Sequence, residues 1–434
     1  MAGNSASLTS TWKKLLLLAV AFTLQAVSLA PYYSYGQLFT ALKEESGEAS
    51  GSLALIGSLR DLTMCLGNVL AGALLRRYGH VRTLELGVVG LVLGMLLDSI
   101  APSPWWLLLS YSLISGLAIA LIVCPAATLL YGRVEGWQLP VAVGLASAGA
   151  GAGTMAVNSA MEVLLELGWR STQRILAGAY AGLLIPCCLA LRCLLKSEGT
   201  QTNQKQPKAW DLKASFRPFL ELKYALFSVC LLLYIATSMI PFTHLVFYAR
   251  DELHYDNAAG LMSLTGLGSM VGRLSCGVLA VWIPARWIFP ALFLLQGCVL
   301  LWLPFCEPWQ LPSFSMIYGV SSGVRIALVT LVVAELFGAH RVQPLFCLLG
   351  IPMGFGLLAG PPLAGLVFDL SGSYQAAFFG SGAAMIALLP LLGLILFLHK
   401  NAAPGGPGPE SADDQGVIDK PKDSQGPQEN VLSC

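Results

Sequence analysis

Residues 144–153 read GLASAGAGAG, and residues 350–365 read GIPMGFGLLAGPPLAG. Each stretch lies within a longer apolar run, at 139–163 and 342–369 respectively. Small side chains let helix backbones approach closely inside a membrane, where dispersion and weak polar contacts hold the helices together. Proline also permits a helix to bend. The two stretches therefore predict closely packed transmembrane helices, and static packing and helix motion both remain open as their role.

The rest of the chain continues this apolar pattern. Apolar residues make up 56% of the chain and charged residues 11%, whereas a soluble domain carries about 25% charged residues. A helix needs roughly 20 apolar residues to cross a bilayer. Twelve runs approach or exceed that length, so we expect an all-α membrane protein with twelve transmembrane helices. The runs lie near 14–38, 52–75, 82–101, 105–131, 139–163, 171–195, 222–248, 258–282, 286–303, 311–337, 342–369 and 375–399.

Composition and motifs exclude several other classes of protein. The net charge is +1 and no dense basic tract occurs, so no nucleic-acid partner is expected. Eleven cysteines are present, but no CxxC pair or Cys/His cluster has the spacing of a metal site, and we expect no metal or cofactor. No HExxH, nucleophile elbow or P-loop appears, so we expect no enzyme. The first run extends beyond the apolar part of a usual signal peptide.

Lysine and arginine positions predict the orientation, because cytoplasmic loops of membrane proteins carry an excess of both. With a cytoplasmic N-terminus, the inside segments hold 18 of the 25 Lys and Arg residues and the outside loops hold four. Both termini should therefore be cytoplasmic. We expect residues 1–13 as a cytoplasmic N-terminus, 14–195 as an N-terminal six-helix half, 196–221 as a cytoplasmic linker, 222–399 as a C-terminal six-helix half and 400–434 as a disordered cytoplasmic tail.

Traces of an internal repeat relate the two halves at an offset of 205 residues. The matches fall on equivalent runs, the second with the eighth and the fifth with the eleventh. A shift of six helices keeps the orientation, so the repeats are parallel, which predicts the major facilitator architecture with a solute site between the halves near the membrane midplane. The matched pairs are Gly67 with Gly272, Gly72 with Gly277, Gly149 with Gly354, Gly151 with Gly356, and Trp169 with Tyr374.

Charged residues within apolar runs are the first candidates for solute binding, because a charge in hydrocarbon must face protein or water. Arg273 lies mid-run in SMVGRLSCG, and its guanidinium can grip a carboxylate with two parallel hydrogen bonds; the alternative is a structural contact between helices. Arg60 and Asp61 point about 100° apart on a helix and need not pair. Asp61 is a candidate proton acceptor or a member of a structural pair. Arg325 is a candidate cavity-lining residue.

Neutral polar and aromatic side chains add further candidates. These are Tyr35 and Gln37 at the end of the first run, Asn158 in the fifth and His244 in the seventh. Aromatic residues near a helix end also form the interfacial belt, which is the interpretation we favour for Tyr32 and Tyr33. An unperturbed histidine titrates near neutral pH, but for His244 we favour a structural role within the protein.

Five segments resemble the monocarboxylate transporter family of the major facilitator superfamily in order and spacing. They read LPVAVGLASAGAGAGTM at 139–155, GWR at 168–170, IPFTHLVFYAR at 240–250, SLTGLGSMVGRLSCGVLA at 263–280 and LAGPPLAGLVFDLSGSY at 358–374. The resemblance covers nearly all of residues 14–399. It implies transport of small monocarboxylates, aromatic amino acids, thyroid hormones or other compact solutes, with or without a proton, and it implies that Arg273 grips the solute.

The chain departs from the pattern of proton-coupled members at several places. Those members carry an Asp one helical turn before the arginine, where this chain has Ser269, and a Lys late in the first span, near Tyr35 and Gly36 here. The acidic, Gly- and Trp-rich signature that opens the first span is also absent. In the loop at 72–82, Arg76 stands in a motif that usually carries an Asp.

Together these features favour a secondary transporter, facilitative rather than proton-coupled, for a small carboxylate or zwitterion at the plasma membrane. Its expected partners are the solute and the lipid bilayer and, by the resemblance, a single-span ancillary glycoprotein. Two alternatives remain open. One is a proton-coupled monocarboxylate symporter, and the other is a non-transporting member that acts as a sensor, scaffold or trafficking partner.

Overall fold

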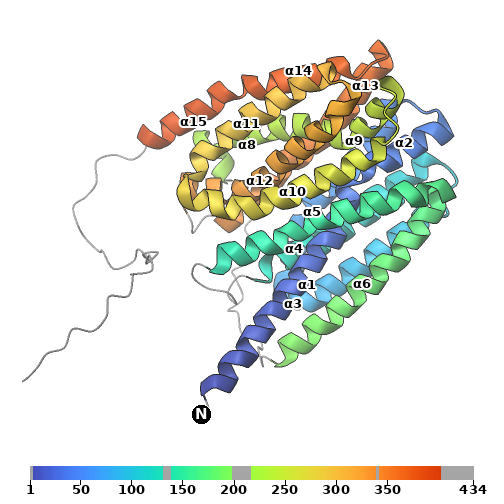
Figure 1. Ribbon diagram of the computed structural model, residues 1–434. Coiled ribbons are helices and arrows are strands. Elements are labelled where there is room, and N and C mark those ends of the chain that lie inside the picture. Colours follow the sequence, from blue (N-terminus) through green and yellow to red (C-terminus); the bar gives the residue numbers. More distant parts are fainter. Residues whose placement is uncertain (1–2, 131–137, 198–216, 339–341, 402–434) are drawn as a thin grey trace, which may run out of the picture.

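The computed structural model describes residues 3–130, 138–197, 217–338 and 342–401, and within these ranges all regular secondary structure is helical (Figure 1). The N-terminal half contains α1 (Gly3–Tyr33), α2 (Tyr35–Ser46), α3 (Ser50–Asp98), the π-helix η2 (Leu108–Ile114), α4 (Ser115–Thr128), α5 (Gln138–Leu164) and α6 (Trp169–Ser197). The C-terminal half contains α8 (Leu222–Ser238), α9 (Ile240–Phe247), the π-helix η5 (Tyr248–Glu252), α10 (Ala258–Trp282), α11 (Ala285–Trp302), α12 (Leu311–Phe337), α13 (Val342–Ser371), α14 (Gln375–Ala387) and α15 (Leu389–Asn401). Short 3₁₀ turns join several of them: η1 (Pro104–Trp106), η3 (Leu165–Leu167), η4 (Arg217–Leu220), η6 (Leu303–Phe305) and η7 (Pro308–Gln310).

Among the described residues, eleven helices or helix pairs are long and apolar enough to cross a membrane. The long helix α3 supplies two of them, because the backbone turns at Gly79, whose φ of 79° is left-handed and favours glycine. The eighth predicted run, 258–282, corresponds to α10, which is 25 residues long. This helix is not one of the eleven. The prediction of an all-α membrane fold is confirmed.

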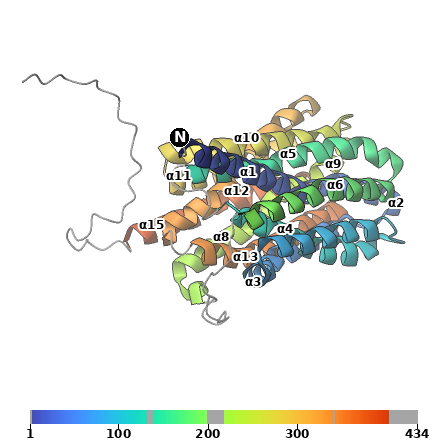
Figure 2. The ribbon, with the colours of Figure 1, turned by 90° about the horizontal axis from the view of Figure 1, so that it is seen from below.

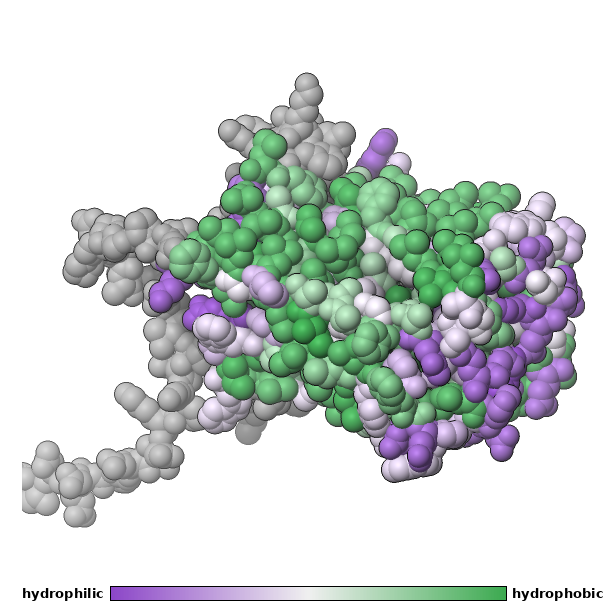
Figure 3. Space-filling view, turned by 90° about the horizontal axis from the view of Figure 1, so that it is seen from above, coloured by the Kyte–Doolittle hydropathy of each residue, from purple (hydrophilic) through white to green (hydrophobic). Residues whose placement is uncertain are grey.

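The core divides between the two halves. One cluster of buried apolar side chains comes from residues 17–194, and the other comes from residues 224–395 with Tyr33 and Cys65 added from the first half. The start of α1 and the end of α15 lie at the same end of the bundle (Figure 2). We call this the terminal end and the opposite one the distal end. Figure 3 shows a broad apolar band, bordered by hydrophilic residues, on the side of the molecule that lipid would cover.

Most of the predicted linker, residues 198–216, and the predicted disordered tail from residue 402 onward lie outside the described residues. The predicted N-terminal segment 1–13 is helical from Gly3, where α1 begins.

The first helix of each half is interrupted at an equivalent position. The break between α1 and α2 falls at Ser34, and the break between α8 and α9 falls at Met239. These two positions are separated by the same offset of 205 residues that relates the glycines in the sequence. A helix break releases backbone carbonyls from the helical pattern, and both breaks supply acceptors to side chains of other helices. Pro31 O accepts from Arg60 and Ser238 O accepts from Tyr318.

Glycines of α5 contact both halves of the molecule. A methyl group at Gly149 or Gly153 would collide with a backbone carbonyl of α1, which belongs to the same half. A methyl group at Gly151 would collide with the backbone of Met270 on α10, in the other half. The glycine-rich stretch therefore forms two packing faces on one helix, as the small side chains predict.

The helix α13 repeats this arrangement in the C-terminal half. Gly356 and Gly360 lie against backbone atoms of α8, within the same half. Gly350 and Gly354 lie against α3 in the other half, near Cys65. The two halves therefore meet along two glycine-lined contacts, α5 with α10 and α13 with α3.

Candidate functional site

Arg273 lies where α10 meets the N-terminal half. Its side chain is 2% exposed. Its Nε donates to Ser269 Oγ at 3.3 Å, one helical turn earlier on α10. Its two terminal nitrogens reach the N-terminal half, where one donates to Ser147 O on α5 at 3.3 Å and the other to Tyr33 Oη on α1 at 3.4 Å. The guanidinium therefore joins three helices across the boundary between the halves.

The glycines explain how this arginine reaches that boundary. Gly151 lets the backbone of α5 approach the backbone of Met270. At Gly144, an added Cβ would lie 3.7 Å from Arg273 O. On the other side of α10, Gly272 lies against the backbone of Val320 on α12. The helix α10 is thus held between α5 and α12 without large side chains in the way, and the long arginine side chain spans the remaining distance.

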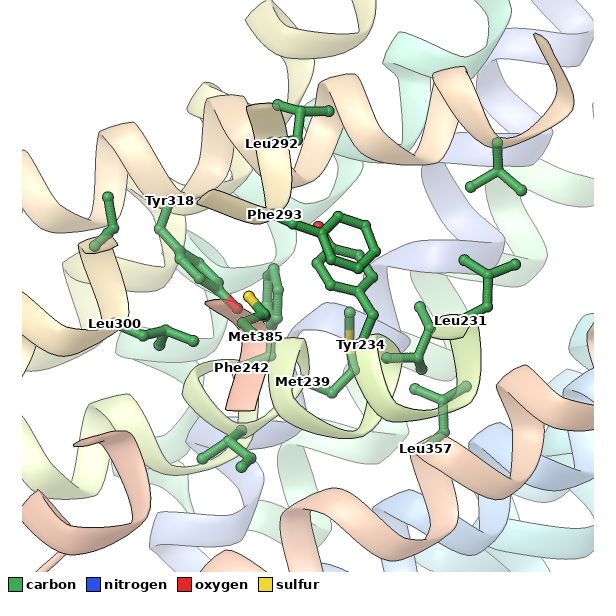
Figure 4. Packing of buried hydrophobic residues seen from close by; sticks show 14 of the residues in the cluster. Leu231, Tyr234, Met239, Phe242, Leu292, Phe293, Leu300, Tyr318, Leu357 and Met385 are labelled. Atoms are coloured by element: carbon green, nitrogen blue, oxygen red, sulfur yellow. The ribbon is translucent and has the colours of Figure 1, made fainter. Parts of the chain in front are cut away.

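Aromatic rings extend from Arg273 into the C-terminal half. The ring of Tyr33 lies 5.0 Å from that of Phe242 on α9, and Phe242 lies 5.7 Å from Tyr318 on α12. The hydroxyl of Tyr318 donates to Ser238 O at the break between α8 and α9. Figure 4 shows Phe242 and Tyr318 beside Met239 at this break. The guanidinium therefore lies at one end of an aromatic surface that crosses between the halves.

Tyr33 was expected in an interfacial belt, and that expectation is wrong. The side chain is buried at 6% exposure and contacts Arg273 and Phe242. Its neighbour Tyr35, which was predicted to bind solute, points the other way, and its hydroxyl donates to Leu53 O on α3. The break at Ser34 separates the two tyrosines, so helical spacing alone does not give their directions. Tyr33, Ser147 and Phe242 are the neighbours of this site that sequence reasoning did not single out.

Gln37 and Asn158 lie together on the distal side of Arg273. The Gln37 amide donates to Asn158 O on α5 at 3.1 Å and to Ala259 O on α10 at 3.2 Å, so it joins the two halves. Asn158 donates to Thr154 O within α5. The side-chain carbonyl oxygens of Gln37 and Asn158 are buried without a hydrogen-bond partner. The two candidate residues Gln37 and Asn158 therefore lie together at the boundary between the halves, apart from Arg273.

His244 has a structural environment. Its Nε2 lies 2.8 Å from Pro361 O on α13, and its ring stacks on Tyr374 at 4.6 Å and meets Phe39 edge-on at 4.9 Å. Its Nδ1 is buried without a partner. The histidine is thus wedged between helices of both halves near the distal end.

Arg60 and Asp61 form an ion pair inside the N-terminal half, although their positions on the helix did not require it. Arg60 NH2 lies 2.8 Å from Asp61 Oδ1, and Arg60 Nε lies 3.0 Å from the same oxygen. Arg60 NH1 donates to Pro31 O at 2.7 Å and to the hydroxyl of Tyr111 in η2. The long arginine side chain turns back over the helix to reach its neighbour, so the angle between the two positions does not separate them.

Arg325 lies apart from Arg273. Its Cζ lies 5.5 Å from the ring centre of Tyr234 on α8, and its side chain is 2% exposed. Its Nε has no hydrogen-bond partner. The helices α10 and α12 cross near Gly272. Arg273 nevertheless reaches toward α1 and α5, whereas Arg325 contacts α8.

Polar contacts join the two halves at the distal end. Both carboxylate oxygens of Asp369, near the end of α13, accept backbone N–H groups of α3, from Ser50 and Gly51 at 3.0 Å each. Arg250 forms an ion pair with Glu44. Lys43 bonds to Ser50 and lies 4.3 Å and 4.1 Å from the rings of Phe247 and Phe368. These contacts close the distal end of the boundary that holds Arg273.

The sequence is similar to those of known proteins over most of its length. The profile described as Major Facilitator Superfamily matches residues 16–342. Monocarboxylate transporter 13 of Bos taurus is 30% identical over 376 residues, which cover 85% of each sequence. Monocarboxylate transporter 11 of Homo sapiens is 28% identical over 382 residues, which cover 85% of this chain and 80% of that protein.

Solved structures resemble the whole helical bundle. The nucleoside transporter NupG aligns with a TM-score of 0.70 at 14% identity, over 88% of this chain and 99% of its own. The E. coli fucose:proton symporter FucP aligns with a TM-score of 0.62 at 14% identity, over 88% of this chain and 98% of its own. At this identity the likeness concerns the fold alone.

Proposed function

The chain belongs to the major facilitator superfamily and, within it, to the monocarboxylate transporter family, and on that premise we propose that it carries a small monocarboxylate or a related zwitterion by facilitated alternating access. The observation that carries this proposal is the position of Arg273. Its guanidinium is buried at the boundary of the halves and contacts groups from both. A guanidinium can hold a carboxylate with two parallel hydrogen bonds.

The surrounding groups suit a compact solute. The recorded contacts of Arg273 with Ser147 O and Tyr33 Oη are 3.3 and 3.4 Å long, at the weak end of the hydrogen-bond range. A carboxylate can therefore replace them with shorter, charge-assisted bonds. Tyr33 and Phe242 supply aromatic surface for the apolar part of the solute. Gln37 and Asn158 add polar groups toward the distal end, and their unpartnered carbonyl oxygens would accept from an ammonium group.

Closure of the distal end supports alternating access. The contacts of Asp369, Arg250 and Lys43 join the halves on that side. In our proposal these contacts break when the halves rock and the solute site opens to the distal side. The excess of Lys and Arg in the loops supports a cytoplasmic terminal end, and we propose that the distal end faces the exterior of the plasma membrane.

Ser269 supports facilitated rather than proton-coupled transport. It occupies the position where proton-coupled members of the family carry an Asp, and its hydroxyl accepts from Arg273. The two alternative proton sites, Asp61 and His244, have protein partners in Arg60 and Pro361. We therefore propose that no proton accompanies the solute.

Uptake into proteoliposomes tests the solute proposal. A panel of labelled monocarboxylates and zwitterions is offered to the wild type and to Arg273→Gln. Loss of the charged grip should lower uptake roughly 10- to 100-fold, since a hydrogen bond to a charged group contributes about 1.5–3 kcal/mol. Arg192→Gln is the matched control, because Arg192 is exposed and lies 3.8 Å from Glu85. Equal uptake by wild type and Arg273→Gln would exclude the proposed grip.

An imposed pH gradient tests the coupling. Facilitated transport predicts that the solute equilibrates and never exceeds the external concentration at any gradient. Accumulation that follows the gradient, and that disappears in Asp61→Asn or His244→Gln, would establish the symporter alternative. A protein that takes up no solute of the panel, yet retains one stable partner on purification, would favour the non-transporting alternative.

A further inference from the structure

A buried guanidinium in the C-terminal half has no carboxylate partner among the residues that the structure describes. Arg325 lies near the middle of α12 with 2% of its surface exposed. The ring of Tyr234 faces it at 5.5 Å, and its Nε makes no hydrogen bond. A ring face is a weak partner for a cation compared with the loss of hydration on burial. Arg325 therefore requires an acceptor that Tyr234 does not supply.

The described acidic residues of this half are all placed elsewhere. They lie at or beside helix ends, and none forms an ion pair with Arg325 within the described part of the chain. Glu335 is the nearest along α12, but ten residues separate the two positions, or roughly 15 Å at 1.5 Å per residue. Both oxygens of Glu335 accept backbone N–H groups at the start of α11, at 2.8 and 3.0 Å. The protein thus provides no carboxylate for Arg325 among its described residues.

A second unsatisfied donor lies on the same tyrosine. Gln296, on α11, is fully buried, and its Oε1 accepts the hydroxyl of Tyr234. Its Nε2 consequently points away from that bond, and it has no partner. Tyr234 therefore connects a guanidinium and an amide N–H group that both require an acceptor, and all three side chains are buried.

The shape of the surroundings limits what can lie there. Phe293 stacks on Tyr234 with the ring centres 3.8 Å apart and the planes 13° apart, and Figure 4 shows the two rings face to face. Tyr234, Gln296 and Arg325 each lie about a dozen residues, or roughly 17 Å, from the terminal end of their helices, so they share one depth. The site thus lies deep in the bundle beside two stacked rings, which suits a small occupant.

We propose that Arg325 and the Nε2 of Gln296 bind a small monovalent anion inside the C-terminal half, beside Tyr234. A single guanidinium balances a single negative charge, and donors without acceptors select an anion over a cation or a neutral donor. The inorganic source of such an anion is chloride, and the organic source is a short carboxylate. The site is separate from Arg273, whose recorded contacts lie across the boundary on α1 and α5, and it does not depend on the proposed transport activity.

Anion-dependent thermal unfolding of the purified full chain tests this site, and it is measured in the wild type and in Arg273→Leu because acetate belongs to the class of solute proposed for Arg273. The protein is compared in sodium chloride, sodium acetate and sodium gluconate at constant ionic strength, because gluconate is too large for an enclosed site. A bound anion should raise the unfolding temperature by about 2–4 °C over gluconate, with saturation. Greater stabilisation by chloride would identify a halide site, and greater stabilisation by acetate a carboxylate site.

Variants decide whether Arg325 carries the effect. Arg325→Leu should lose the anion dependence and should unfold in gluconate no earlier than the wild type, because the uncompensated charge is gone. Gln296→Leu provides a second variant if the first fails to fold, and it should weaken the apparent anion affinity several-fold. Arg273→Leu is the control: it should keep the wild-type chloride dependence, and any acetate dependence that it retains belongs to Arg325 rather than to the proposed solute grip.

The absence of any anion effect on the wild type would overturn the proposal, as would an undiminished effect in both Arg325→Leu and Gln296→Leu. These outcomes are distinct from failure of the proposed transport function, because no uptake is measured. A transport-inactive Arg273→Leu that still responds to chloride would separate the two sites directly.

Discussion

Apart from Arg273 at the boundary, each half of the molecule buries an arginine among its own helices, and these two are satisfied in different ways. In the N-terminal half, Arg60 is 1% exposed and bonds to Asp61, Pro31 O and Tyr111. In the C-terminal half, Arg325 is equally buried but lies over the Tyr234 ring with its Nε unpartnered. The first charge is neutralised by the protein itself and serves the scaffold. The second leaves an electrostatic demand that an outside anion can meet.

A cavity of about 20 Å³ beside Arg60 reinforces this contrast. It has room for about one water molecule, and the buried, unpartnered Gln173 Oε1 and Tyr180 Oη line it. One water molecule there could donate to Gln173 Oε1 and bond to the hydroxyl of Tyr180. It would not neutralise Arg325 in the other half, because water carries no charge.

The largest expected effect comes from removing the carboxylate of Asp61, which is the counter-ion of Arg60. Asp61→Asn leaves the Arg60 charge buried without its counter-ion, and this should lower the free energy of unfolding by about 3–5 kcal/mol. Chemical denaturation of purified protein measures it. The double variant Arg60→Leu/Asp61→Leu is the control and should recover part of the loss. A loss of unfolding free energy below about 1 kcal/mol for Asp61→Asn would mean that Arg60, like Arg325, is stable without a protein counter-ion.

Glycine substitutions should affect both halves equally. An added methyl group at Gly153 meets Ala26 O, and one at Gly360 meets Ala236 O, so each helix would have to shift. Gly153→Ala and Gly360→Ala should each lower the free energy of unfolding by about 1–3 kcal/mol. Gly178→Ala, where nothing lies within 4 Å of the added atom, is the matched control and should be neutral or slightly stabilising. A large difference between the first two variants would break the equivalence of the halves.

In the distal contact made by Asp369, the C-terminal half supplies the acid and the N-terminal half supplies the start of a helix. Asp369→Asn removes the charge that faces two backbone N–H groups of α3. It should shift the balance toward a distal-open form by about 1–2 kcal/mol, or roughly 5- to 30-fold. The labelling rate of a reporter cysteine at the buried position Thr40, with an impermeant maleimide, measures this shift. An unchanged labelling rate, after subtraction of the protein without the reporter, would contradict it.

The smallest effect concerns the two carbonyls at the helix breaks. Ser238 O accepts from the neutral hydroxyl of Tyr318, whereas Pro31 O accepts from the charged Arg60. Tyr318→Phe should therefore cost only about 0.5–1.5 kcal/mol of unfolding free energy. Thermal unfolding against wild type measures it, with Phe314→Leu as a control for the ring that stacks on Tyr318. A loss of unfolding free energy above about 3 kcal/mol would show that the helix break at Met239 depends on Tyr318 as strongly as the break at Ser34 depends on Arg60.

The fold could be predicted because its signals are long and repeated. Apolar runs of helical length, a polar segment between two sets of six and matched glycines all survive small errors in the helix ends. The position of Arg273 at the boundary was also predictable, because few charges lie inside the runs and small residues mark the helices that meet there.

The direction of individual side chains could not be predicted in the same way. Tyr33 and Tyr35 lie two residues apart, but the irregular backbone at Ser34 sends them to different helices. Arg60 and Asp61 are adjacent, so their side chains leave the helix about 100° apart. The arginine side chain is long and flexible enough to form an ion pair with Asp61 all the same. Whether Arg325 has a carboxylate partner depends on where acidic residues far away in the sequence lie in space, and no local sequence pattern gives that information.

The backbone contacts of α5 and α13 bear on how fast the halves can interconvert. Where glycine meets a main chain, one surface can slide past the other without any side chain crossing a rotational barrier. Resistance to the motion then concentrates in the few polar bonds that cross the boundary, of which those at the distal end include charged groups exposed to solvent. The turnover rate of such a molecule would be governed by bond breaking there, so it should respond to ionic strength more than to the viscosity of the surrounding lipid.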